Sequence, residues 1–445
     1  MILIHKATII NEGDTFVGSV LVERERISKI YRDDVPERLI NECSNVIDAR
    51  GLYLIPGAID DQVHFRDPGL TYKGDISTES KAAVAGGVTS YMEMPNTNPQ
   101  TVTIEELDKK FEMAAGKSVA NFSFYLGATN NNLEELKKVD KNHVCGVKIF
   151  MGSSTGNMLV DNERALQQIF AEVDMIIATH CEKEDIIRDN IESFKKEFGE
   201  DLPIKYHPLI RSEEACYQSS AQAIELADKY GSRLHVLHLS TARELTLLSD
   251  STLEDKKITG EVCVHHLWFT DKDYDKYGAK IKWNPAVKTI NDREALRRGL
   301  LNNKLDVVAT DHAPHLMSEK EGGSLKAASG GPLVQHSLQV MFEMVHEGFF
   351  TPELVVEKMC HAPSKLFKVR NRGFIREGYY ADLVLLDFNE KYTVTKDNIL
   401  YKCSWSPFEG KTFNTTVKMT FVNGNLVYDN GVVIDNQYGM ALDFN

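Results

Sequence analysis

The sequence contains no apolar stretch long enough to span a bilayer. Its first residues, MILIHKATIINEG, alternate as in a strand and lack the basic segment, long apolar run and small-residue cleavage site of a signal peptide. These two absences lead us to expect a cytoplasmic protein that does not associate with membranes.

The sequence also lacks paired cysteines. Its cysteines are seven in number, scattered along the chain, and none forms a CxxC pair. A disulfide framework and a zinc ribbon are both excluded by this spacing. The pattern is typical of a protein from a reducing compartment.

The sequence has fewer basic than acidic residues: 51 Lys and Arg against 65 Asp and Glu, which gives a formal net charge of −14. An acidic surface argues against nucleic acid or anionic membrane as the main partner. It still allows a local basic pocket for an anionic small molecule. A homo-oligomer is compatible with this composition.

Both ends of the chain read as short strands separated by turns. The Asn423-Gly424 pair, between two such runs, is a hairpin signal. Two strand-rich ends around a long middle predict one small β domain built from both termini. The expected strands are 2–10, 18–23, 27–31, 46–48, 381–387, 415–422 and 425–428.

The middle of the chain alternates short apolar runs with helical patterns at 104–115, 162–170 and 219–230. Strand and helix in alternation, with apolar strands, predict a parallel sheet buried on both faces. Eight runs fit a (β/α)8 barrel, although a doubly wound open sheet fits the same pattern. The runs are 53–59, 90–94, 121–127, 145–151, 175–180, 234–239, 258–265 and 306–310.

Polar side chains follow directly where these apolar runs end. In a parallel barrel such strand ends open onto one face, so residues far apart in sequence converge there. A single His at a strand end is usually structural, but several together favour a metal site, since imidazole and carboxylate are the usual ligands of catalytic zinc. The candidate ligands are His64, His180, His238 and Asp311.

Lys148 lies inside an apolar run, CGVKIFM. An unpaired ammonium is costly to bury there, so its ordinary interpretation is a snorkelling or ion-paired lysine. The functional interpretation is a neutral amine that has reacted with carbon dioxide to give a carbamate that bridges two cations.

At this point the sequence strongly resembles the cyclic amidohydrolases, and the dihydroorotase family in particular. The opening motif is PGAID at 56–60 followed by VHFRDPG at 63–69, and MPNTNP at 94–99 resembles the dihydroorotase signature. The resemblance covers essentially the whole chain. Its other motifs are GGVT (86–89), GVK (146–148), HCE (180–182), HLSTA (238–242), NP (284–285), ATDHAPH (309–315), Gly378 and ADLV (381–384).

The resemblance implies a (β/α)8 barrel over 55–372 and a composite β-sandwich from 1–54 and 373–445. It implies one or two Zn²⁺ ions, with carboxylated Lys148, His180 and His238 on one and His64 and Asp311 on the other. Asp311 would take a proton from the attacking hydroxide and return it to the leaving nitrogen. The reaction would close N-carbamoyl-L-aspartate to dihydroorotate, reversibly, in pyrimidine biosynthesis.

The resemblance also implies a set of substrate-binding residues. Arg66 is expected to hold the substrate carboxylate, because its planar fork meets both oxygens. The other residues expected to contact substrate are His64, Asn96, Asn284, His315, Gly330 and Gly331.

The chain departs from the family at one position. The family has His-x-His after the first barrel strand, but this chain has Gln62-Val63-His64. A Gln amide oxygen is a weak zinc ligand beside imidazole. We therefore expect the metal position served by His64 and Asp311 to be the weaker one, while Lys148, His180 and His238 are complete.

Two other functions stay open from the sequence. One is a sibling cyclic amidohydrolase such as an allantoinase or hydantoinase, which Arg66 and the MPNT motif disfavour because those substrates lack this carboxylate. The other is an inactive homologue that acts as a scaffold for aspartate carbamoyltransferase. Gln62 is the only feature that favours a scaffold.

Overall fold

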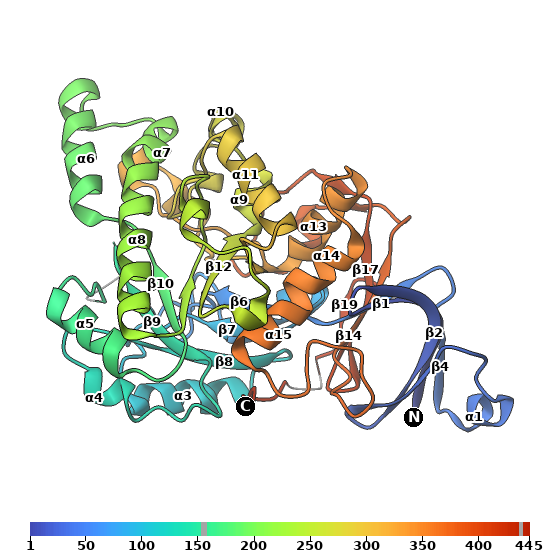
Figure 1. Ribbon diagram of the computed structural model, residues 1–445. Helices are drawn as coiled ribbons and strands as arrows, with labels where there is room; N and C mark the ends of the chain where they lie inside the picture. The colour runs from blue at the N-terminus through green and yellow to red at the C-terminus, as the bar shows by residue number, and fades with distance from the viewer. Residues whose placement is uncertain (153–157, 436–438) are drawn as a thin grey trace.

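Eight parallel strands form the centre of the molecule, which is a computed structural model that describes residues 1–152, 158–435 and 439–445 (Figure 1). The strands pair in chain order from β6 to β13. The first and last meet where the His64 N–H donates to the His312 carbonyl at 2.7 Å, so the barrel nearly closes. The expected (β/α)8 barrel is confirmed. Its strands are β6 (Ala58–Val63), β7 (Val88–Glu93), β8 (Asn121–Gly127), β9 (Gly146–Phe150), β10 (Ile177–His180), β11 (Leu234–Val236), β12 (Ile258–Cys263) and β13 (Val307–Ala309).

Helices surround the barrel, and several of them begin at a polar N-cap residue. Thr103, Asn162, Ser212 and Thr289 each accept a hydrogen bond from the first turn of a helix, which fixes where that helix starts. The longer helices are α2 (Ile76–Ala85), α3 (Ile104–Ala115), α5 (Glu163–Glu172), α6 (Glu184–Phe198), α8 (Glu213–Tyr230), α11 (Ile290–Leu301) and α13 (Ser337–His346). The shorter ones are α1 (Glu37–Glu42), α4 (Leu133–Leu136), α7 (His207–Ile210), α9 (Val264–Trp268), α10 (Tyr274–Tyr277), α12 (Gly323–Lys326), α14 (Pro352–Val356) and α15 (Ala362–Phe367).

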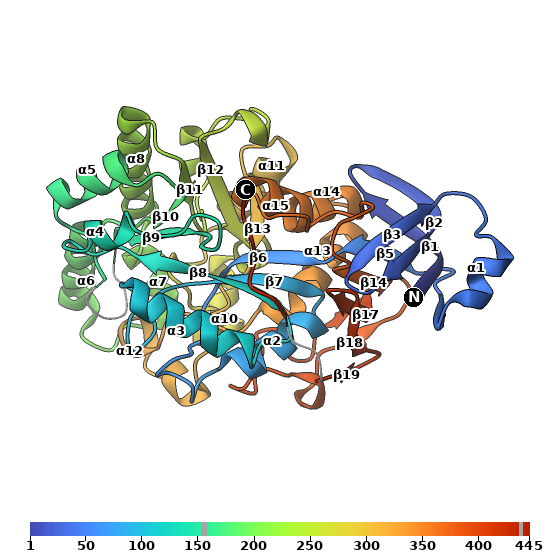
Figure 2. The same cartoon turned by 90° about the horizontal axis from the view of Figure 1, so that it is seen from below.

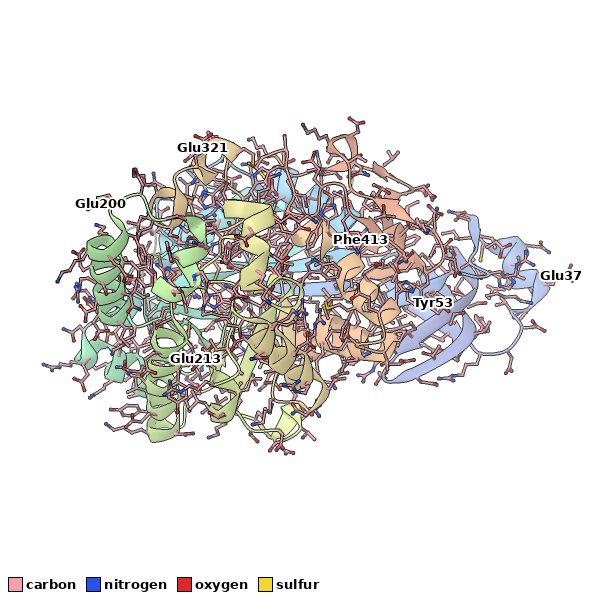
Figure 3. The ribbon with its side chains drawn as sticks, turned by 90° about the horizontal axis from the view of Figure 1, so that it is seen from above. Glu37, Tyr53, Glu200, Glu213, Glu321 and Phe413 are labelled. Carbon is pink, nitrogen blue, oxygen red and sulfur yellow. The ribbon has the colours of Figure 1, made fainter. Side chains whose placement is uncertain are left out.

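The two ends of the chain form one nine-stranded mixed sheet, which confirms the composite β domain. Its path runs β19-β18-β17-β14-β5-β1-β2-β3, with β4 paired to β1. Blue N-terminal and red C-terminal strands lie together beside the barrel (Figure 2). Glu37, on α1, and Glu200 mark opposite ends of the elongated molecule in Figure 3. The strands are β1 (Ile2–Asn11), β2 (Asp14–Glu23), β3 (Arg26–Tyr31), β4 (Asn45–Asp48), β5 (Tyr53–Pro56), β14 (Leu383–Asp387), β17 (Thr416–Val422), β18 (Asn425–Asp429) and β19 (Val432–Val433), and a separate pair is β15 (Tyr392–Thr393) with β16 (Thr412–Phe413).

The prediction of one strand over 53–59 is wrong. The segment is two strands in different sheets, β5 in the terminal sheet and β6 in the barrel, and Gly57 separates them. A side chain at Gly57 would put its Cβ 2.0 Å from Thr89 Oγ1, and the Gly57 N–H donates to the Asp382 carbonyl at 2.9 Å. The chain therefore crosses between sheets at a close contact that only glycine allows.

A buried polar network joins the terminal sheet to the barrel. Arg372 pairs with Asp382 and donates to Asn423 Oδ1 at 2.7 Å. Asn121, on barrel strand β8, donates to Asp382 Oδ2 at 3.2 Å. Every partner is buried, so the network fixes the two sheets relative to each other. Within the described ranges, no helix combines the length and apolar content needed to cross a membrane.

A candidate active site at the carboxyl end of the barrel

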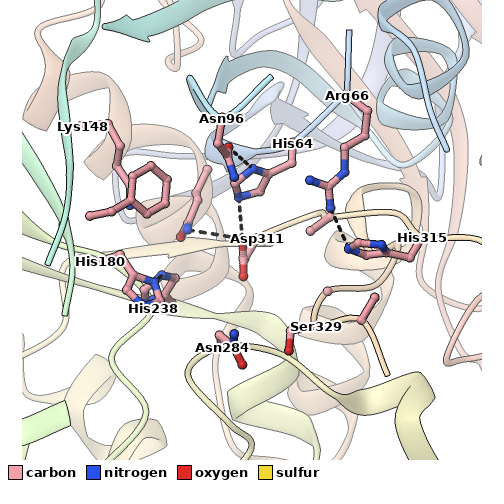
Figure 4. Close-up of a pocket in the computed structure, with 15 residues that line it drawn as sticks. His64, Arg66, Asn96, Lys148, His180, His238, Asn284, Asp311, His315 and Ser329 are labelled. Atoms are coloured by element: carbon pink, nitrogen blue, oxygen red, sulfur yellow. Dashed lines mark hydrogen bonds and ion pairs between the residues drawn. The ribbon is translucent and has the colours of Figure 1, made fainter. Parts of the chain in front are cut away.

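A cavity of about 320 Å³ opens at the carboxyl ends of the barrel strands (Figure 4). Its lining comes from the ends of β6, β7, β9, β10, β11 and β13 and from loops over them, as expected for a barrel of this kind. Of the predicted site residues only Gly331 is not part of the lining. The lining residues are Gln62, His64, Arg66, Asn96, Lys148, Phe150, His180, His238, Asn284, Asp311, Ala313, His315, Ala328, Ser329 and Gly330.

His180 and His238 face each other across one side of the cavity. His180 Nδ1 lies 3.0 Å from His238 Nε2. His180 Nε2 lies 2.9 Å from Glu182 Oε2, and because a carboxylate only accepts, Nε2 carries the proton. The His180 Nδ1 lone pair therefore points at His238 Nε2. Burial, with nearby His180 and Lys148, lowers the pKa of His238 well below its usual range, so its ring is neutral.

Lys148 lies beside this histidine pair and is almost fully buried. Its Nζ finds no hydrogen-bond partner among the described residues, and it lies 4.7 Å from the centre of the Phe150 ring. Burial lowers the pKa of Lys148 to about 8, although Asp311 and Glu261 oppose the shift. An amine with this pKa is partly neutral near pH 8, and a neutral amine is a nucleophile.

Glu182 and Arg211 hold His180 from behind. Arg211 pairs with Glu182 Oε2, the same oxygen that accepts from His180. Burial alone would raise the pKa of Glu182, but Arg211 and His180 lower it to about 2. The carboxylate is thus ionised and orients the imidazole, as second partners of metal-bound histidines do. Glu182 was not predicted as a functional residue, although its place two residues after His180 was an available signal.

His64 and Asp311 form a second pair on the opposite side. His64 Nε2 lies 3.1 Å from Asp311 Oδ1, and His64 Nδ1 lies 2.8 Å from Asn96 Oδ1. An amide oxygen only accepts, so Nδ1 donates to Asn96 and the Nε2 lone pair faces the carboxylate. Burial lowers the pKa of His64, while Asp311 opposes the shift. A lone pair that faces a carboxylate at this distance is the geometry of two ligands of one cation.

Gln62 points its amide nitrogen, not its oxygen, at this second pair. Gln62 Nε2 donates to Asp311 Oδ1 at 3.3 Å, and Gln62 Oε1 lies 3.8 Å from Cys263 Sγ. The amide therefore competes for the carboxylate oxygen that faces His64. In this orientation Gln62 offers no donor atom to a cation between His64 and Asp311.

A basic corner lies next to the His64 and Asp311 pair. Arg66 Nη2 lies 3.1 Å from His315 Nε2, and Arg66 Nε donates to the Pro314 carbonyl at 3.2 Å. Lys73 Nζ lies 3.1 Å from His315 Nδ1. Burial, followed by Arg66 and Lys73, lowers the pKa of His315 far below its usual range, so its ring is neutral. The corner carries positive charge within an acidic protein and suits an anionic group.

Asn284 and Gly330 border the open side of the cavity. Asn284 Oδ1 is buried and accepts no hydrogen bond from the described residues. Gly330 has φ +119°, and a Cβ there would lie 2.7 Å from the Ala313 carbonyl oxygen, so the loop requires glycine. Gly331 lies behind the cavity, where an added Cβ would meet Trp283 and Trp405. Gly330 therefore lines the cavity, whereas Gly331 packs against the tryptophans behind it.

Three residues of the cavity adopt left-handed backbone conformations that side chains other than glycine rarely take. The φ angles are +69° at Arg66, +39° at His238 and +46° at Asp311. Each lies two or three residues after the end of a barrel strand. Such strain persists where the surrounding fold imposes it, and here it turns three polar side chains inward.

The donor atoms of the cavity fit a metal centre. The facing imidazole nitrogens of His180 and His238, the His64 nitrogen beside the Asp311 carboxylate and the unpartnered Lys148 amine line one cavity, and imidazole and carboxylate suit zinc. The lysine amine fits as a bridge only once it is carboxylated, since an ammonium would repel the cation.

Comparisons with known proteins identify the family of the chain. The model of the Amidohydrolase family matches residues 53–427. A protein of Methanosphaera stadtmanae named dihydroorotase is 30% identical over 96% of this chain and 97% of its own length. A protein of Pyrococcus furiosus with the same name is 32% identical over 96% of this chain and 92% of its own.

Among solved structures, the L-hydantoinase (dihydropyrimidinase) from Arthrobacter aurescens superposes with a TM-score of 0.93. It is 27% identical, and the match covers 99% of both chains. Relatives by sequence thus carry the name dihydroorotase, and this structural neighbour is a hydantoinase.

Proposed function

This chain belongs to the amidohydrolase family, and on that premise we propose that it is a zinc-dependent dihydroorotase. The chain is a cyclic amidohydrolase of the dihydroorotase and hydantoinase group. Our proposal concerns the substrate: the enzyme interconverts N-carbamoyl-L-aspartate and (S)-dihydroorotate plus water, a step of pyrimidine biosynthesis.

We propose that Lys148, as a carbamate, holds zinc together with His180 and His238. His64, Asp311 and the carboxylated Lys148 would hold a second, weaker zinc position. Bound zinc would polarise the ring amide carbonyl and lower the pKa of a water molecule to about 7. The buried, unpartnered Nζ of Lys148 and its lowered pKa support carboxylation, because only a neutral amine adds to carbon dioxide.

Asp311 is the proposed general base and acid. Its carboxylate points into the cavity, and its backbone carbonyl accepts from Trp283 Nε1 at 3.2 Å, which holds it in place. In hydrolysis Asp311 takes the proton of the attacking oxygen nucleophile and delivers it to the ring nitrogen as the amide bond breaks. Ring closure runs the same transfers in reverse.

The observation that carries the proposal is the basic corner. Arg66 donates its Nε hydrogen to the Pro314 carbonyl and one Nη2 hydrogen to His315. The other N–H groups of the guanidinium remain available for an anion. Dihydroorotate carries a carboxylate on its ring, and Arg66 can meet both oxygens while the ring amide reaches toward Asp311. Asn96 and His315 complete this proposed carboxylate site.

The remaining cavity residues are proposed to orient the ring. The unpartnered Asn284 Oδ1 can accept from a ring N–H. Gly330 lets the loop backbone lie next to the cavity, because a side chain at this position would clash with Ala313. The Asn284 side chain and the loop backbone at Gly330 would thus hydrogen-bond to the N–H and carbonyl groups of the ring.

A hydantoinase activity is the second candidate, and the Arthrobacter aurescens structure favours it. The two functions differ in one chemical respect: the hydantoinase substrate needs no partner for a carboxylate. The buried Arg66 would then have no substrate anion to pair with. Burying an unpaired charge is unfavourable, and a site for an uncharged ring would not need this arginine.

Incubation of the zinc-supplied protein with N-carbamoyl-L-aspartate at mildly acidic pH tests the proposal. We expect dihydroorotate to form, and Asp311→Asn to slow its formation by roughly 10²–10⁴-fold. The proposal would be refuted by a folded, zinc-containing protein that neither forms dihydroorotate from N-carbamoyl-L-aspartate nor hydrolyses dihydroorotate.

A further inference from the structure

A second cluster of metal-ligating side chains lies deeper in the barrel and outside the cavity described above. Asp61 on β6, His235 on β11 and Glu261 on β12 all point into the barrel interior, and each is 0% exposed. One donor atom from each lies within 4.8 Å of the other two. None of the three lines the active-site cavity.

The hydrogen bonds of His235 determine which of its nitrogens could bind a cation in place of a proton. Thr259 Oγ1 donates its own hydrogen to the Leu234 carbonyl at 3.2 Å, so it can only accept from His235 Nδ1 at 2.8 Å. His235 Nδ1 is therefore the donor. Its Nε2 then faces Asp61 Oδ2 at 3.1 Å and Glu261 Oε2 at 3.9 Å. This is the arrangement of a metal-binding histidine whose other nitrogen is anchored by a hydrogen bond.

Two carboxylate oxygens of the cluster have no hydrogen-bond partner among the described residues. Asp61 Oδ1 and Glu261 Oε2 are buried, and neither accepts a hydrogen bond from any residue that the structure describes. Across the same described ranges, neither carboxylate forms an ion pair with Lys or Arg. Burial, together with Asp61, raises the pKa of Glu261 well above its usual range, so Glu261 keeps its proton until a cation displaces it and pairs with the carboxylates.

We propose that Asp61, His235 and Glu261 bind a divalent transition metal ion, most suitably zinc, as a structural site separate from the catalytic cavity. One imidazole nitrogen and two carboxylate oxygens form a donor set that zinc accepts at about 2.0–2.2 Å per ligand. The cation neutralises both carboxylates and takes up the His235 lone pair. The proposal does not depend on which cyclic amide the enzyme hydrolyses.

The site reaches the catalytic centre through Glu261. Glu261 Oε1 accepts from the His238 backbone N–H at 2.9 Å, and His238 is held at φ +39°. A cation that fixes Glu261 therefore also fixes the strained backbone of a proposed catalytic ligand. Because the cluster is fully buried, the ion must enter during folding, and a chelator reaches it only after the barrel opens.

Zinc analysis of three variants tests this proposal. The proteins are purified with zinc and treated with the chelator dipicolinate under native conditions. The zinc that remains per chain is then measured by elemental mass spectrometry. Wild type should keep about one zinc per chain after this treatment. Asp61→Asn should lose that ion while its circular dichroism stays native, and His180→Ala, which disables the cavity, should keep it.

Asp60→Asn is the matched control, since Asp60 is also buried in β6 but accepts from Thr310 Oγ1 at 2.6 Å and not from His235. It should keep the ion. Wild type without chelator-resistant zinc, or an Asp61→Asn protein that retains it, would overturn the site.

Anomalous diffraction at the zinc edge from wild-type crystals decides the matter if Asp61→Asn does not fold. A peak between Asp61, His235 and Glu261 supports the proposal. Peaks only among the cavity histidines would refute it and leave the proposed dihydroorotase function intact.

Discussion

Gln62 donates its amide N–H to Asp311 Oδ1 at 3.3 Å, and this is the carboxylate oxygen that lies 3.1 Å from His64 Nε2. The amide thus occupies the oxygen that a cation beside His64 would need. We therefore propose an asymmetric metal site, in which carboxylated Lys148, His180 and His238 offer a full ligand set and the side with His64 and Asp311 does not.

Gln62→His should raise the zinc content of the protein or lower the zinc concentration needed for full activity, because imidazole is the stronger ligand. Zinc titration followed by elemental analysis measures this. Gln62→Ala is the control: it removes the amide without adding a ligand and should not raise affinity as histidine does. Two tightly held cavity zinc ions in the unmodified protein would show that Gln62 costs nothing.

Asp311→Asn should fold normally, keep the zinc held by Lys148, His180 and His238, and lose turnover by roughly 10²–10⁴-fold. Asparagine keeps the side-chain shape but accepts no proton at neutral pH. Steady-state kinetics and zinc content are measured on the same preparation. Turnover within a few-fold of wild type would remove Asp311 from the mechanism.

Reactivation of metal-free protein should depend on pH through Lys148. Burial lowers the pKa of Lys148 to about 8, so the reactive neutral amine predominates above pH 8 and declines about tenfold per pH unit below it. At constant carbon dioxide pressure, the reactivation rate should rise from pH 6 to 8 and level off near pH 9. Lys148→Arg, which stays charged, should not reactivate at any pH. A rate that does not vary with pH would argue against a carbamate.

The terminal sheet should depend on Asp382. Asp382→Ala leaves Arg372 buried without its partner, which typically costs about 3–5 kcal/mol of unfolding free energy. Chemical denaturation measures the loss. Asp48→Ala is the control: it breaks the exposed Arg50 pair at the surface and should change stability little. Equal effects of the two substitutions would contradict the role of the buried network.

The sequence was sufficient for most of the barrel because buried parallel strands are continuous apolar runs. Strand β8 and helix α3 coincide with the predicted 121–127 and 104–115. The single strand expected at 53–59 failed because the apolar pattern continues through Gly57, whereas the sheet changes there for a steric reason that involves Thr89. Periodicity does not record such long-range contacts.

The cavity residues were predicted from strand ends and motif resemblance, but their partners were not. Glu182 and Arg211 support His180 from two separate elements, and the orientation of Gln62 depends on Asp311 and Cys263. The cluster around His235 was invisible for the same reason. Its members come from three strands and meet only inside the closed barrel.

The ratio of kcat/KM for dihydroorotate to kcat/KM for dihydrouracil tests the central claim most directly. Dihydrouracil is the same ring without the carboxylate, so the ratio isolates recognition of the carboxylate, and the Arg66 variant measures the share of Arg66. We expect dihydroorotate to be strongly preferred by wild type. Arg66→Lys keeps the charge but loses the fork, and should lower the dihydroorotate value by about 10- to 150-fold, or about 1.5–3 kcal/mol, with little effect on dihydrouracil. A zinc-loaded wild type that prefers dihydrouracil, or an Arg66→Lys protein with an unchanged ratio, would contradict the assignment and favour a hydantoinase.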